Sequence, residues 1–580
     1  MHQRTFARVA PARARFFFYW CLLVALFLAW RLYDVQALKG PMYAREALAQ
    51  RSDIVEVFAR RGSILDRNGN VLVRSLPSQS VYAIPREIVD PTAATQRLQK
   101  IFGKLDPSVV AALHDRHLWF VWIARKVPHE TAQRVRSLGL TGIDLKEEDT
   151  GQRVDTAGRQ ASTLLGFVGT DENGLDGLEY SYDDVLRGHS GRVSLEADEF
   201  GRPIPFGQER VITPAQPGSN LELTIDPYLQ FVAEQALGKQ FVTYHALDAS
   251  AIVMDPWTGE ILAMANLPNF DPNRFWKYSD DQRRDRAVTD SYEPGSTYKL
   301  ITAAAALESH KVSLTSRFPA RDTLEVGGQT IHNAEDGFMA GTGGSETLGQ
   351  IVEFSHNVGA AEVGLSIGAK TLYEMERKAG FGSPTGVGLS GESPGIVPPP
   401  SEWSGSSLAT TSFGQGVSAT PLQMARYYSA IANGGLLMQP HIVRAVYDQQ
   451  GKLLHRYGPT VVRRVFSQRT ADELRTFLRA VVLHGTGDPT AQIPGYATAG
   501  KTGTAEMVVD GAYRSGYYAA SFIGMVPYPR ARYLIYVKVE RPIGSYYGSV
   551  VAAPAFAAIA RAAMLHAGVL PSADVARNGP

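Results

Sequence analysis

The sequence of 580 residues is too long for a single hydrophobic core and indicates two or more folded domains. Its 58 lysine and arginine residues nearly balance its 57 aspartate and glutamate residues, so the overall charge gives no indication of nucleic-acid binding. The single cysteine, Cys21, lies in an apolar run near the N-terminus, which excludes intrachain disulfides and thiolate metal sites from the rest of the chain. This composition is compatible with an oxidising compartment but does not require one.

A basic stretch followed by an apolar run opens the chain. Four arginines precede the apolar segment 16–30, and no acidic residue occurs before Asp34. The run is shorter than the roughly 20 residues of a membrane-spanning helix, but a snorkelling arginine and two further residues extend it. A cleaved signal peptide is the alternative, although cleavage requires small residues where bulky ones stand at 30–33. We therefore expect an uncleaved single-pass anchor, with residues 1–15 in the cytoplasm, residues 16–36 in the membrane and the remainder outside.

The following region, residues 37–215, mixes short strand and helix patterns with charged loops. Its Asn68-Gly69 dipeptide stands between two apolar runs, which predicts a two-residue β-hairpin. His114 and His117 form an H-x-x-H motif without a third ligand in view, so we interpret them as surface histidines rather than as a metal site. No grouping of residues in this region indicates catalysis.

A second domain is predicted from about residue 216 to residue 570. Segment 249–268 reads as a strand, a turn and a second strand. Two more strands are expected near the end of the chain, at 520–527 and 531–540. Since these strands are far apart in the sequence, the sheet must be assembled from distant segments.

Helices are predicted between and after these strands. Thr420 is suited to the N-cap of a helix, with Pro421 at the first helical position and Gly434 beyond its end. The alanine-rich segment 553–569 predicts a closing helix, and residues 571–580 read as a disordered tail. Strands at both ends with helices between them indicate an α/β or α+β domain.

Ser296 and Lys299 form the only Ser-x-x-Lys motif of the sequence, where a Pro-Gly turn leads into an alanine-rich helix. Serine is a poor nucleophile unless a base removes its proton. A lysine three residues later lies on the same helix face, but its ordinary pKa of about 10.4 keeps it protonated. Burial or a second cation could lower that pKa towards about 7–8, the range that general-base catalysis needs. The motif therefore predicts catalysis only in a partly buried site that holds another positive group.

Two later segments supply candidates for such a site. Ser355 and Asn357 stand two residues apart, and their hydroxyl and amide could relay a proton and hold a substrate amide. The other segment is a predicted strand before an Asp510-Gly511 hairpin turn, and it carries Lys501, Thr502, Gly503 and Thr504. Its lysine is a candidate second cation, its lysine and threonines suit a substrate carboxylate, and its glycine lets a ligand lie against the backbone. Each of these signals is weak by itself.

Together and in this order, Ser-x-x-Lys, Ser-x-Asn and Lys-Thr-Gly form the motif set of β-lactamases and penicillin-binding proteins. RGSILDRNG, GLDGLEYSYDDVLRG and LTIDPYLQ resemble hallmarks of class B high-molecular-weight penicillin-binding proteins, so the resemblance covers nearly the whole chain. YEPGSTYKL and YYGSVVAAPAF resemble the septal, FtsI-type branch, and Asn357 stands where the elongation branch commonly has aspartate. Two departures are His356, at a position that is often serine, and FGQG at 413–416, which varies among branches.

The resemblance implies a peptidoglycan D,D-transpeptidase of septal wall synthesis and cell division. The implied fold is a transpeptidase domain at 216–570, with an antiparallel sheet, helices on both faces and an all-helical subdomain. An elongated, mixed pedestal or dimerisation domain would occupy residues 37–215. Localisation would be the inner membrane, with a periplasmic catalytic domain. The implied partners are stem peptides ending in D-Ala-D-Ala, β-lactams, the membrane, and a polytopic septal glycosyltransferase with other division proteins; no nucleic acid, metal or cofactor is expected.

The resemblance also assigns roles to the motif residues. Ser296 would attack the carbonyl between the two terminal D-alanines, and Lys299 would take its proton. Ser355 and Lys501 would pass the proton to the departing D-alanine, while Asn357 would hold the substrate amide. Backbone N–H groups of Ser296 and Thr504 would hold the oxyanion. The terminal carboxylate would bind Lys501, Thr502 and Thr504 along the strand that contains Gly503, and an amine of a neighbouring stem would take the acyl group.

Several alternatives remain open at this point. An elongation-type transpeptidase would use the same motifs. A carboxypeptidase or β-lactamase would also use them, although small soluble hydrolases need neither an anchor nor a pedestal. A non-enzymatic β-lactam sensor usually carries several membrane helices, and an inactive scaffold would have no need of intact motifs.

Overall fold

The computed structural model describes residues 11–196, 209–334, 344–509 and 511–572. The chain divides into two compact units: residues 1–59 with 189–216 form the first, and residues 60–188 with 217–580 form the second. The proposed tail at 571–580 and the turn residue Asp510 lie largely or wholly outside the described residues. Each unit is described by itself.

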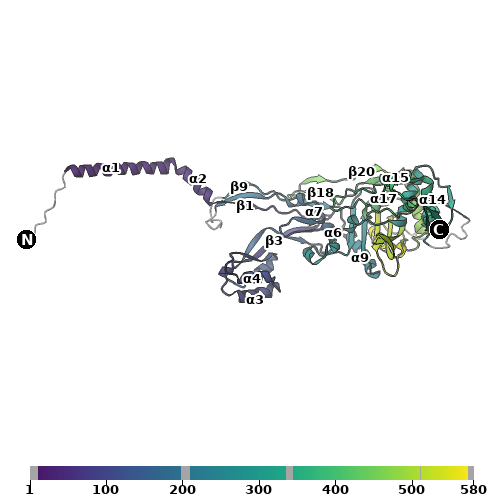
Figure 1. Ribbon diagram of the computed structural model, residues 1–580, viewed down its shortest axis with the longest axis horizontal. Helices are drawn as coiled ribbons and strands as arrows, with labels where there is room; N and C mark the ends of the chain where they lie inside the picture. Colours follow the sequence, from purple (N-terminus) through teal and green to yellow (C-terminus); the bar gives the residue numbers. More distant parts are fainter. Residues whose placement is uncertain (1–10, 197–208, 335–343, 510, 573–580) are drawn as a thin grey trace, which may run out of the picture. The chain divides into compact units, whose positions relative to one another are not determined.

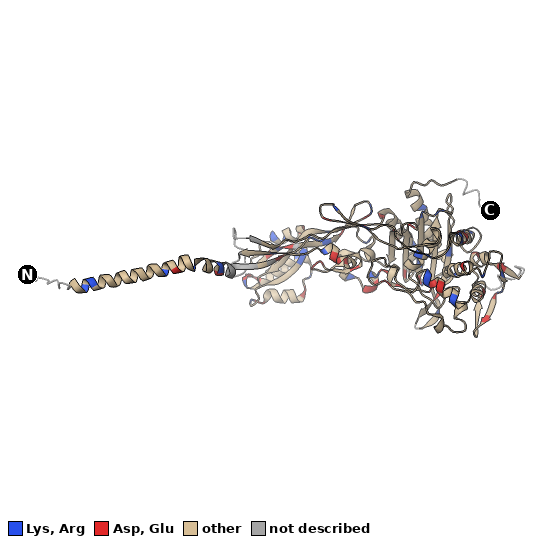
Figure 2. Cartoon of the chain, turned by 90° about the horizontal axis from the view of Figure 1, so that it is seen from above, with Lys and Arg blue, Asp and Glu red and all other residues tan. Residues whose placement is uncertain are grey.

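The first unit begins with a long exposed apolar helix. Helix α1 (Pro11–Tyr33) continues into a short π-helical segment, η1 (Asp34–Leu38), and is followed by α2 (Gly40–Arg51). Segment Pro11–Leu38 is the one helical stretch in the described part of the chain that is long and apolar enough to cross a membrane. Figure 2 shows charged residues near the ends of this stretch and an uncharged run between them. The prediction of one N-terminal apolar helix is confirmed.

A small antiparallel sheet completes the first unit. Its strand order is β1-β8-β9, and its strands are β1 (Ser52–Val57), β8 (Gly191–Glu196) and β9 (Glu209–Thr213). Strand β1 is followed by more than a hundred residues before β8, so the first unit is formed from two segments that are distant in the sequence.

The second unit starts with a mixed sheet of seven strands. Its order is β19-β18-β10-β2-β3-β4, and β5 also pairs with β3. The predicted hairpin joins β2 and β3 and contains Gly69, with a φ of +82°, but its loop is longer than the expected two residues, because the Asp66 N–H donates to the Asn70 carbonyl and encloses residues 67–69. The strands are β2 (Ile64–Leu65), β3 (Val71–Ala83), β4 (Val121–Val127), β5 (Ile143–Asp155), β10 (Asn220–Leu223), β18 (Val443–Tyr447) and β19 (Leu453–Arg456).

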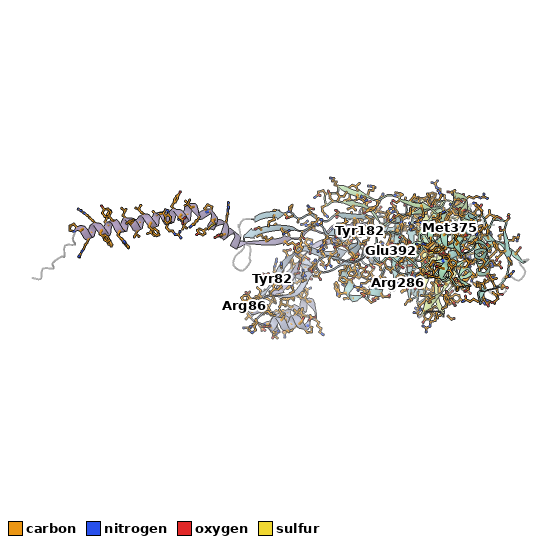
Figure 3. The ribbon with its side chains drawn as sticks, turned by 45° about the horizontal axis from the view of Figure 1, so that its top comes forward. Tyr82, Arg86, Tyr182, Arg286, Met375 and Glu392 are labelled. Carbon is orange, nitrogen blue, oxygen red and sulfur yellow. The ribbon has the colours of Figure 1, made fainter. Side chains whose placement is uncertain are left out.

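Three helices cover the outer part of this sheet. They are α3 (Pro91–Phe102), α4 (Pro107–His114) and α5 (His129–Arg136), and they share a small core with β3, β4 and β5. Figure 1 shows α3 and α4 beside β3, and Figure 3 shows Tyr82 and Arg86 in the same region. His114 and His117 are exposed here, as predicted.

Buried ion pairs join the two hallmark segments of this region. The Arg61 guanidinium donates to Glu179 at 2.7 Å and to Asp183 at 2.6 Å, and Arg153 donates to the other oxygen of Glu179 at 2.7 Å. Arg61, Arg153 and Glu179 expose at most 5% of their side chains. Because an unpaired charge would be strongly destabilising at this depth, these three residues depend on one another.

A second, five-stranded antiparallel sheet forms the centre of the catalytic region. Its order is β12-β11-β23-β22-β21, so β11 and β12 pair with strands from the end of the chain, as predicted. Helices α9 (Pro227–Thr243) and α20 (Ala553–His566) pack on one face, and α17 (Pro421–Ala432) packs on the other. The strands are β11 (Asp248–Met254), β12 (Ile261–Leu267), β21 (Ala499–Val509), β22 (Ala512–Val526) and β23 (Tyr533–Glu540).

A group of helices lies beside this sheet, and Figure 1 shows α14, α15 and α17 gathered there. Helix α17 begins after Thr420, whose hydroxyl accepts a hydrogen bond from the Gln423 backbone, so the predicted N-cap is confirmed. The other members are α12 (Lys299–Glu308), α13 (Leu348–Glu353), α14 (Asn357–Ile367), α15 (Ala369–Lys378), α16 (Ser407–Thr411) and α18 (Gln468–Leu483). The antiparallel sheet with helices on both faces and a helical subdomain agrees with the expected fold.

The remaining elements are short. They are η2 (Pro85–Glu87), α6 (Ser162–Leu165), β6 (Phe167–Val168), β7 (Gly174–Asp176), α7 (Gly177–Ser181), α8 (Asp183–Arg187), η3 (Pro272–Lys277), α10 (Asp280–Arg283), α11 (Arg286–Thr289), η4 (Gly295–Tyr298), β13 (Arg317–Pro319), β14 (Thr323–Val326), β15 (Gln329–His332), β16 (Ser345–Thr347), η5 (Pro400–Glu402), β17 (Leu436–Met438), β20 (Val461–Arg464) and α19 (Gly548–Val551). Four of them, η4, β15, β16 and α19, contribute to the site described next.

Candidate active site

Ser296 lies in a tight turn that is held from several sides. The turn η4 leads directly into α12, and Gly295 has a φ of +53°, a conformation that favours glycine. A Cβ atom on Gly295 would also lie 3.1 Å from the Thr504 carbonyl oxygen. From α17, the buried Tyr428 hydroxyl donates to the Thr297 carbonyl at 2.7 Å. The serine is therefore positioned by a turn that requires glycine, a neighbouring strand and a buried helix.

Lys299 connects Ser296 to the Ser355–Asn357 segment. Its Nζ lies 3.0 Å from Ser296 Oγ, 3.3 Å from Ser355 Oγ and 2.8 Å from Asn357 Oδ1. The Ser355 carbonyl oxygen is a fourth contact, at 2.5 Å. Because only 1% of Lys299 is exposed, these polar atoms replace the water that an ordinary lysine would bind.

Lys501 also contacts Ser355. Its Nζ is 2.9 Å from Ser355 Oγ and 3.1 Å from the Thr502 carbonyl oxygen, and the residue is fully buried. Ser355 Oγ thus lies between two amines, which is the arrangement that a proton relay requires. The structure brings Ser296, Lys299, Ser355, Asn357 and Lys501 into one hydrogen-bonded group.

Burial favours the neutral forms of both amines, and the charge of Lys501 adds to this effect at Lys299. The pKa of Lys299 is held well below its ordinary value, first by burial and then by the positive charge of Lys501, against the opposing charge of Glu346. Burial lowers the pKa of Lys501 to about 7. A neutral amine beside a serine hydroxyl can accept its proton, so the group can support nucleophilic catalysis.

The Ser355–Asn357 segment lies between two helices. Ser355 follows α13 and has a φ of +63°, which is unusual for a residue with a side chain. Asn357 begins α14, and its Nδ2 donates to the His332 carbonyl at 3.0 Å. Asn333 Oδ1 accepts hydrogen bonds from the backbone N–H groups of Asn357 and Val358 at 2.9 and 3.0 Å. Asn333 was missed in the sequence because it lies 24 residues away, in a segment without a recognisable motif.

The segment from Lys501 to Thr504 lies in β21, beside the turn that carries Ser296, and the predicted strand is confirmed. Thr502 Oγ1 is 2.7 Å from Thr486 Oγ1, and Thr504 Oγ1 accepts a hydrogen bond from the Gly548 backbone at 3.2 Å. Gly503 has a packing role: a Cβ atom there would lie 2.3 Å from Ser521 Oγ. That Gly503 also lets a ligand lie against the backbone stays a prediction.

Two further residues at the site were missed by the sequence reasoning. Thr486 comes from the loop after α18, and its backbone N–H donates to the Glu353 carbonyl at 3.3 Å, next to the Ser355 turn. Glu293 precedes the turn of Ser296 and accepts hydrogen bonds from the Gly416 backbone at 2.9 Å and from the Tyr513 hydroxyl at 3.0 Å. Burial raises the pKa of Glu293. The sequence feature that could have indicated Glu293 is its position directly before the Pro-Gly turn.

Metal binding has no visible basis at this site. In the described ranges, no three histidine, cysteine, aspartate or glutamate side chains are grouped so that they could hold a metal ion.

Comparison with protein families gives two matches. Residues 249–561 match the penicillin binding protein transpeptidase domain, and residues 56–223 match the penicillin-binding protein dimerisation domain. The peptidoglycan D,D-transpeptidase FtsI of Escherichia coli K12 is 32% identical over 554 residues, covering 93% of this chain and 89% of its own length. Stage V sporulation protein D of Bacillus subtilis is 34% identical over 556 residues, with 95% and 85% covered.

Solved structures give the same result. The crystal structure of penicillin binding protein 3 from Mycobacterium tuberculosis, complexed with aztreonam, aligns with a TM-score of 0.69 at 30% identity. The alignment covers 89% of this chain and 98% of that one. Penicillin binding protein 2X from Streptococcus thermophilus aligns with a TM-score of 0.72 at 25% identity, covering 90% of this chain and 81% of that one.

Proposed function

This chain belongs to the class B high-molecular-weight penicillin-binding proteins and is a serine-type peptidoglycan D,D-transpeptidase, and on this premise we propose that it cross-links stem peptides of the septal wall during cell division. The septal role is supported by the YEPGSTYKL and YYGSVVAAPAF segments and by Asn357. The catalytic proposal rests above all on one observation, the 3.0 Å contact between Lys299 Nζ and Ser296 Oγ in a buried site.

In the first step, Ser296 attacks the carbonyl between the two terminal D-alanines. Neutral Lys299 accepts the hydroxyl proton as the bond forms. Backbone N–H groups of Ser296 and Thr504 hold the negative oxygen, and such donors typically contribute about 10²–10³ in rate. A Cβ atom placed on Gly295 would lie 3.1 Å from the Thr504 carbonyl oxygen, so the turn of Ser296 and strand β21 approach closely there, which supports this role.

The leaving group departs as free D-alanine. Its nitrogen needs a proton, which passes from Lys299 through the Ser355 hydroxyl; Lys501, 2.9 Å from the same hydroxyl, favours that transfer. Asn357 holds the amide of the donor stem. The terminal carboxylate binds Lys501, Thr502 and Thr504, whose amine and hydroxyls line one strand around Gly503. A bound carboxylate would favour the protonated form of the Lys501 amine.

In the second step, an amine from a neighbouring stem attacks the acyl-enzyme and releases Ser296. A β-lactam presents a strained amide and a carboxylate to the same residues, and Ser296 opens its ring. The leaving nitrogen then stays tethered to the acyl group and obstructs the approach of the acceptor amine. We therefore expect a long-lived adduct, whereas a β-lactamase would hydrolyse it.

Membrane topology is the second part of the proposal. The arginine-rich start of α1 would keep residues 1–15 in the cytoplasm, residues 16–36 would span the inner membrane, and the catalytic domain would be periplasmic. The pedestal would occupy residues 37–215 and the catalytic domain residues 216–570. Protease added to spheroplasts should digest the chain beyond about Lys39. Full protection would contradict this topology.

The septal assignment implies protein partners in the membrane, with a polytopic glycosyltransferase and other division proteins as the expected ones. Replacing residues 16–33 with an unrelated membrane helix should leave penicillin binding intact but fail to support division. Full complementation would reduce this segment to an anchor.

Localisation tests the septal role directly. A fluorescent fusion should gather at mid-cell before constriction. Even distribution along the side wall would favour the elongation role. Appearance only during spore formation would favour a sporulation role, which the similarity to stage V sporulation protein D makes the second candidate.

A further inference from the structure

A buried acid–histidine pair lies beside the Ser355–Asn357 segment of the site. His356 Nδ1 is 2.5 Å from Glu346 Oε2, and the two residues expose 5% and 3% of their surfaces. Glu346 belongs to β16, whereas His356 stands between Ser355 and Asn357. The pair therefore connects a separate strand to the turn that carries two of the proposed catalytic residues.

The packing around this pair is specific. A Cβ atom on Gly359, in the first turn of α14, would lie 2.4 Å from Glu346 Oε1, so this glycine leaves room for the carboxylate. The His356 backbone N–H donates to the Ile351 carbonyl at 3.0 Å. Ser355, directly before His356, has a left-handed φ of +63° that its surroundings must maintain. A contact that fixes His356 therefore also fixes the direction of the Ser355 hydroxyl.

The pair also acts on Lys299 through its charge. Burial and Lys501 lower the pKa of Lys299, and Glu346 is the carboxylate that opposes them. Glu346 in turn faces Glu362 of α14, and Arg321 lies 3.7 Å from Glu362. Ser296, Ser355 and Asn357, which contact Lys299 directly, are uncharged. Among the causes that shift the pKa of Lys299, Glu346 is thus the one carboxylate.

We propose that Glu346 and His356 form a positioning unit for acyl transfer, which holds the Ser355–Asn357 turn and balances the positive charge at Lys299. The inference rests on the proposed function, since it takes Lys299 as the base and Ser355 as the proton relay. Neither residue of the pair contacts the reacting atoms; both act through the residues that do. His356 departs from the serine often found at this position, so the unit is a feature of this chain's own residues.

Two substitutions test the charge of Glu346 and the positioning role of His356 separately. Glu346→Gln keeps the size of the side chain and an oxygen for the histidine N–H, but it removes the negative charge. Since that charge raises the pKa of Lys299, its loss should move the acid limb of the acylation rate to lower pH. His356→Leu keeps the volume but removes the hydrogen bond, so acylation at the pH optimum should fall by about tenfold.

A matched control is available on the neighbouring helix. Glu362→Gln removes a partly buried carboxylate that faces Glu346 but does not act on Lys299 directly. Its acylation profile should overlay that of the wild type.

The experiment measures acylation by a fluorescent penicillin, with the full-length protein in detergent, from weakly acidic to weakly basic pH. Wild type and Ser296→Ala are included, because acylation that survives Ser296→Ala would contradict the proposed function itself. If Ser296→Ala abolishes acylation, the proposal is supported when the acid limb of Glu346→Gln lies about half a pH unit or more below that of the wild type. The acid limb of Glu362→Gln should coincide with that of the wild type. A Glu346→Gln profile that overlays the wild type, or an equal shift in Glu362→Gln, overturns the proposal.

The positioning role of His356 and Glu346 is tested separately. Thermal unfolding of each variant establishes that it is folded before rates are compared. If Glu346→Gln does not fold, His356→Leu still decides: a folded variant with a wild-type acylation rate overturns the proposal, and a loss of about tenfold supports it.

Discussion

Two buried lysine sites in the catalytic region are equally hidden from solvent but differ in their partners. Lys538 of β23 is fully buried, forms an ion pair with Glu540 and lies 3.7 Å from Asp248. Lys299 and Lys501 are buried to the same degree, but in the described residues they contact only hydroxyl, amide and carbonyl oxygens. The first site is an ion-pair network, and the second is a pair of amines without a carboxylate at contact distance.

This difference reverses the effect of burial. Burial lowers the pKa of all three amines, but Glu540 and Asp248 outweigh it at Lys538 and raise the pKa of that residue. Lys299 and Lys501 have no such partner, so their pKa values are lowered. A buried lysine is therefore structural or catalytic according to whether a carboxylate accompanies it.

The largest expected effect is a loss of activity on substitution of Lys299. Lys299→Ala should lower the rate of acylation by penicillin by about 10²–10⁴-fold, because Ser296 loses its base. The melting temperature should change little. Lys311→Ala is a suitable control, since this lysine follows the same helix but lies outside the site. A Lys299→Ala variant that acylates at nearly the wild-type rate would mean that another base acts on Ser296.

Lys538→Met should affect stability rather than chemistry. It leaves Glu540 as a buried charge without its ion-pair partner, so the free energy of unfolding should fall by about 3–5 kcal/mol. The raised pKa means that this stabilisation is complete below the ordinary lysine pKa and is lost as the pH rises through the folded-state value. Denaturant titration of the soluble catalytic region, or of the full chain in detergent, measures it. An unchanged unfolding free energy would contradict the ion-pair account.

Lys501→Met should change the free energy of unfolding in the opposite direction. It removes an amine whose burial without a carboxylate is unfavourable, so the free energy of unfolding should rise by about 1–4 kcal/mol, while acylation is lost. The gain should be largest below about pH 7 and should shrink as the pH approaches 10.5, since the folded-state pKa is about 7 and the ordinary value is 10.5. Destabilisation equal to that of Lys538→Met would remove the distinction between the two sites.

Thr486→Val is the smallest of these changes. The Thr486 hydroxyl is 2.7 Å from that of Thr502, so its loss should weaken carboxylate recognition and lower the acylation rate by about three- to tenfold. Thr490→Val, in the same loop, removes only a weak 3.5 Å contact to the Gly487 carbonyl and should leave the rate unchanged. Equal rates in both variants would show that Thr486 does not support Thr502.

Local features of this molecule could be predicted from the sequence. The turn and helix of Ser296 and Lys299, the cap of α17 and the hairpin at Gly69 each depend on residues a few positions apart. Such features follow from propensity and spacing. The motif set then indicated which distant segments meet, although it gave no distances.

Features made by distant residues could not be predicted in this way. Asn333 and Thr486 reach the site from loops and Glu346 from an edge strand, and no local pattern marks them. The same holds for the partners of Lys538, because Asp248 and Glu540 meet only when β11 pairs with β23. Long-range pairing determines whether a buried charge is compensated, and local sequence patterns do not reveal that pairing.

The most direct test of the central claim follows the acyl-enzyme itself. Intact-protein mass spectrometry after brief exposure to penicillin should show a single adduct, which maps to the peptide containing Ser296, persists for many minutes and is absent from Lys299→Ala. This result would identify both the nucleophile and its base. An adduct on another residue, or one lost within seconds while hydrolysed drug accumulates, would contradict the account.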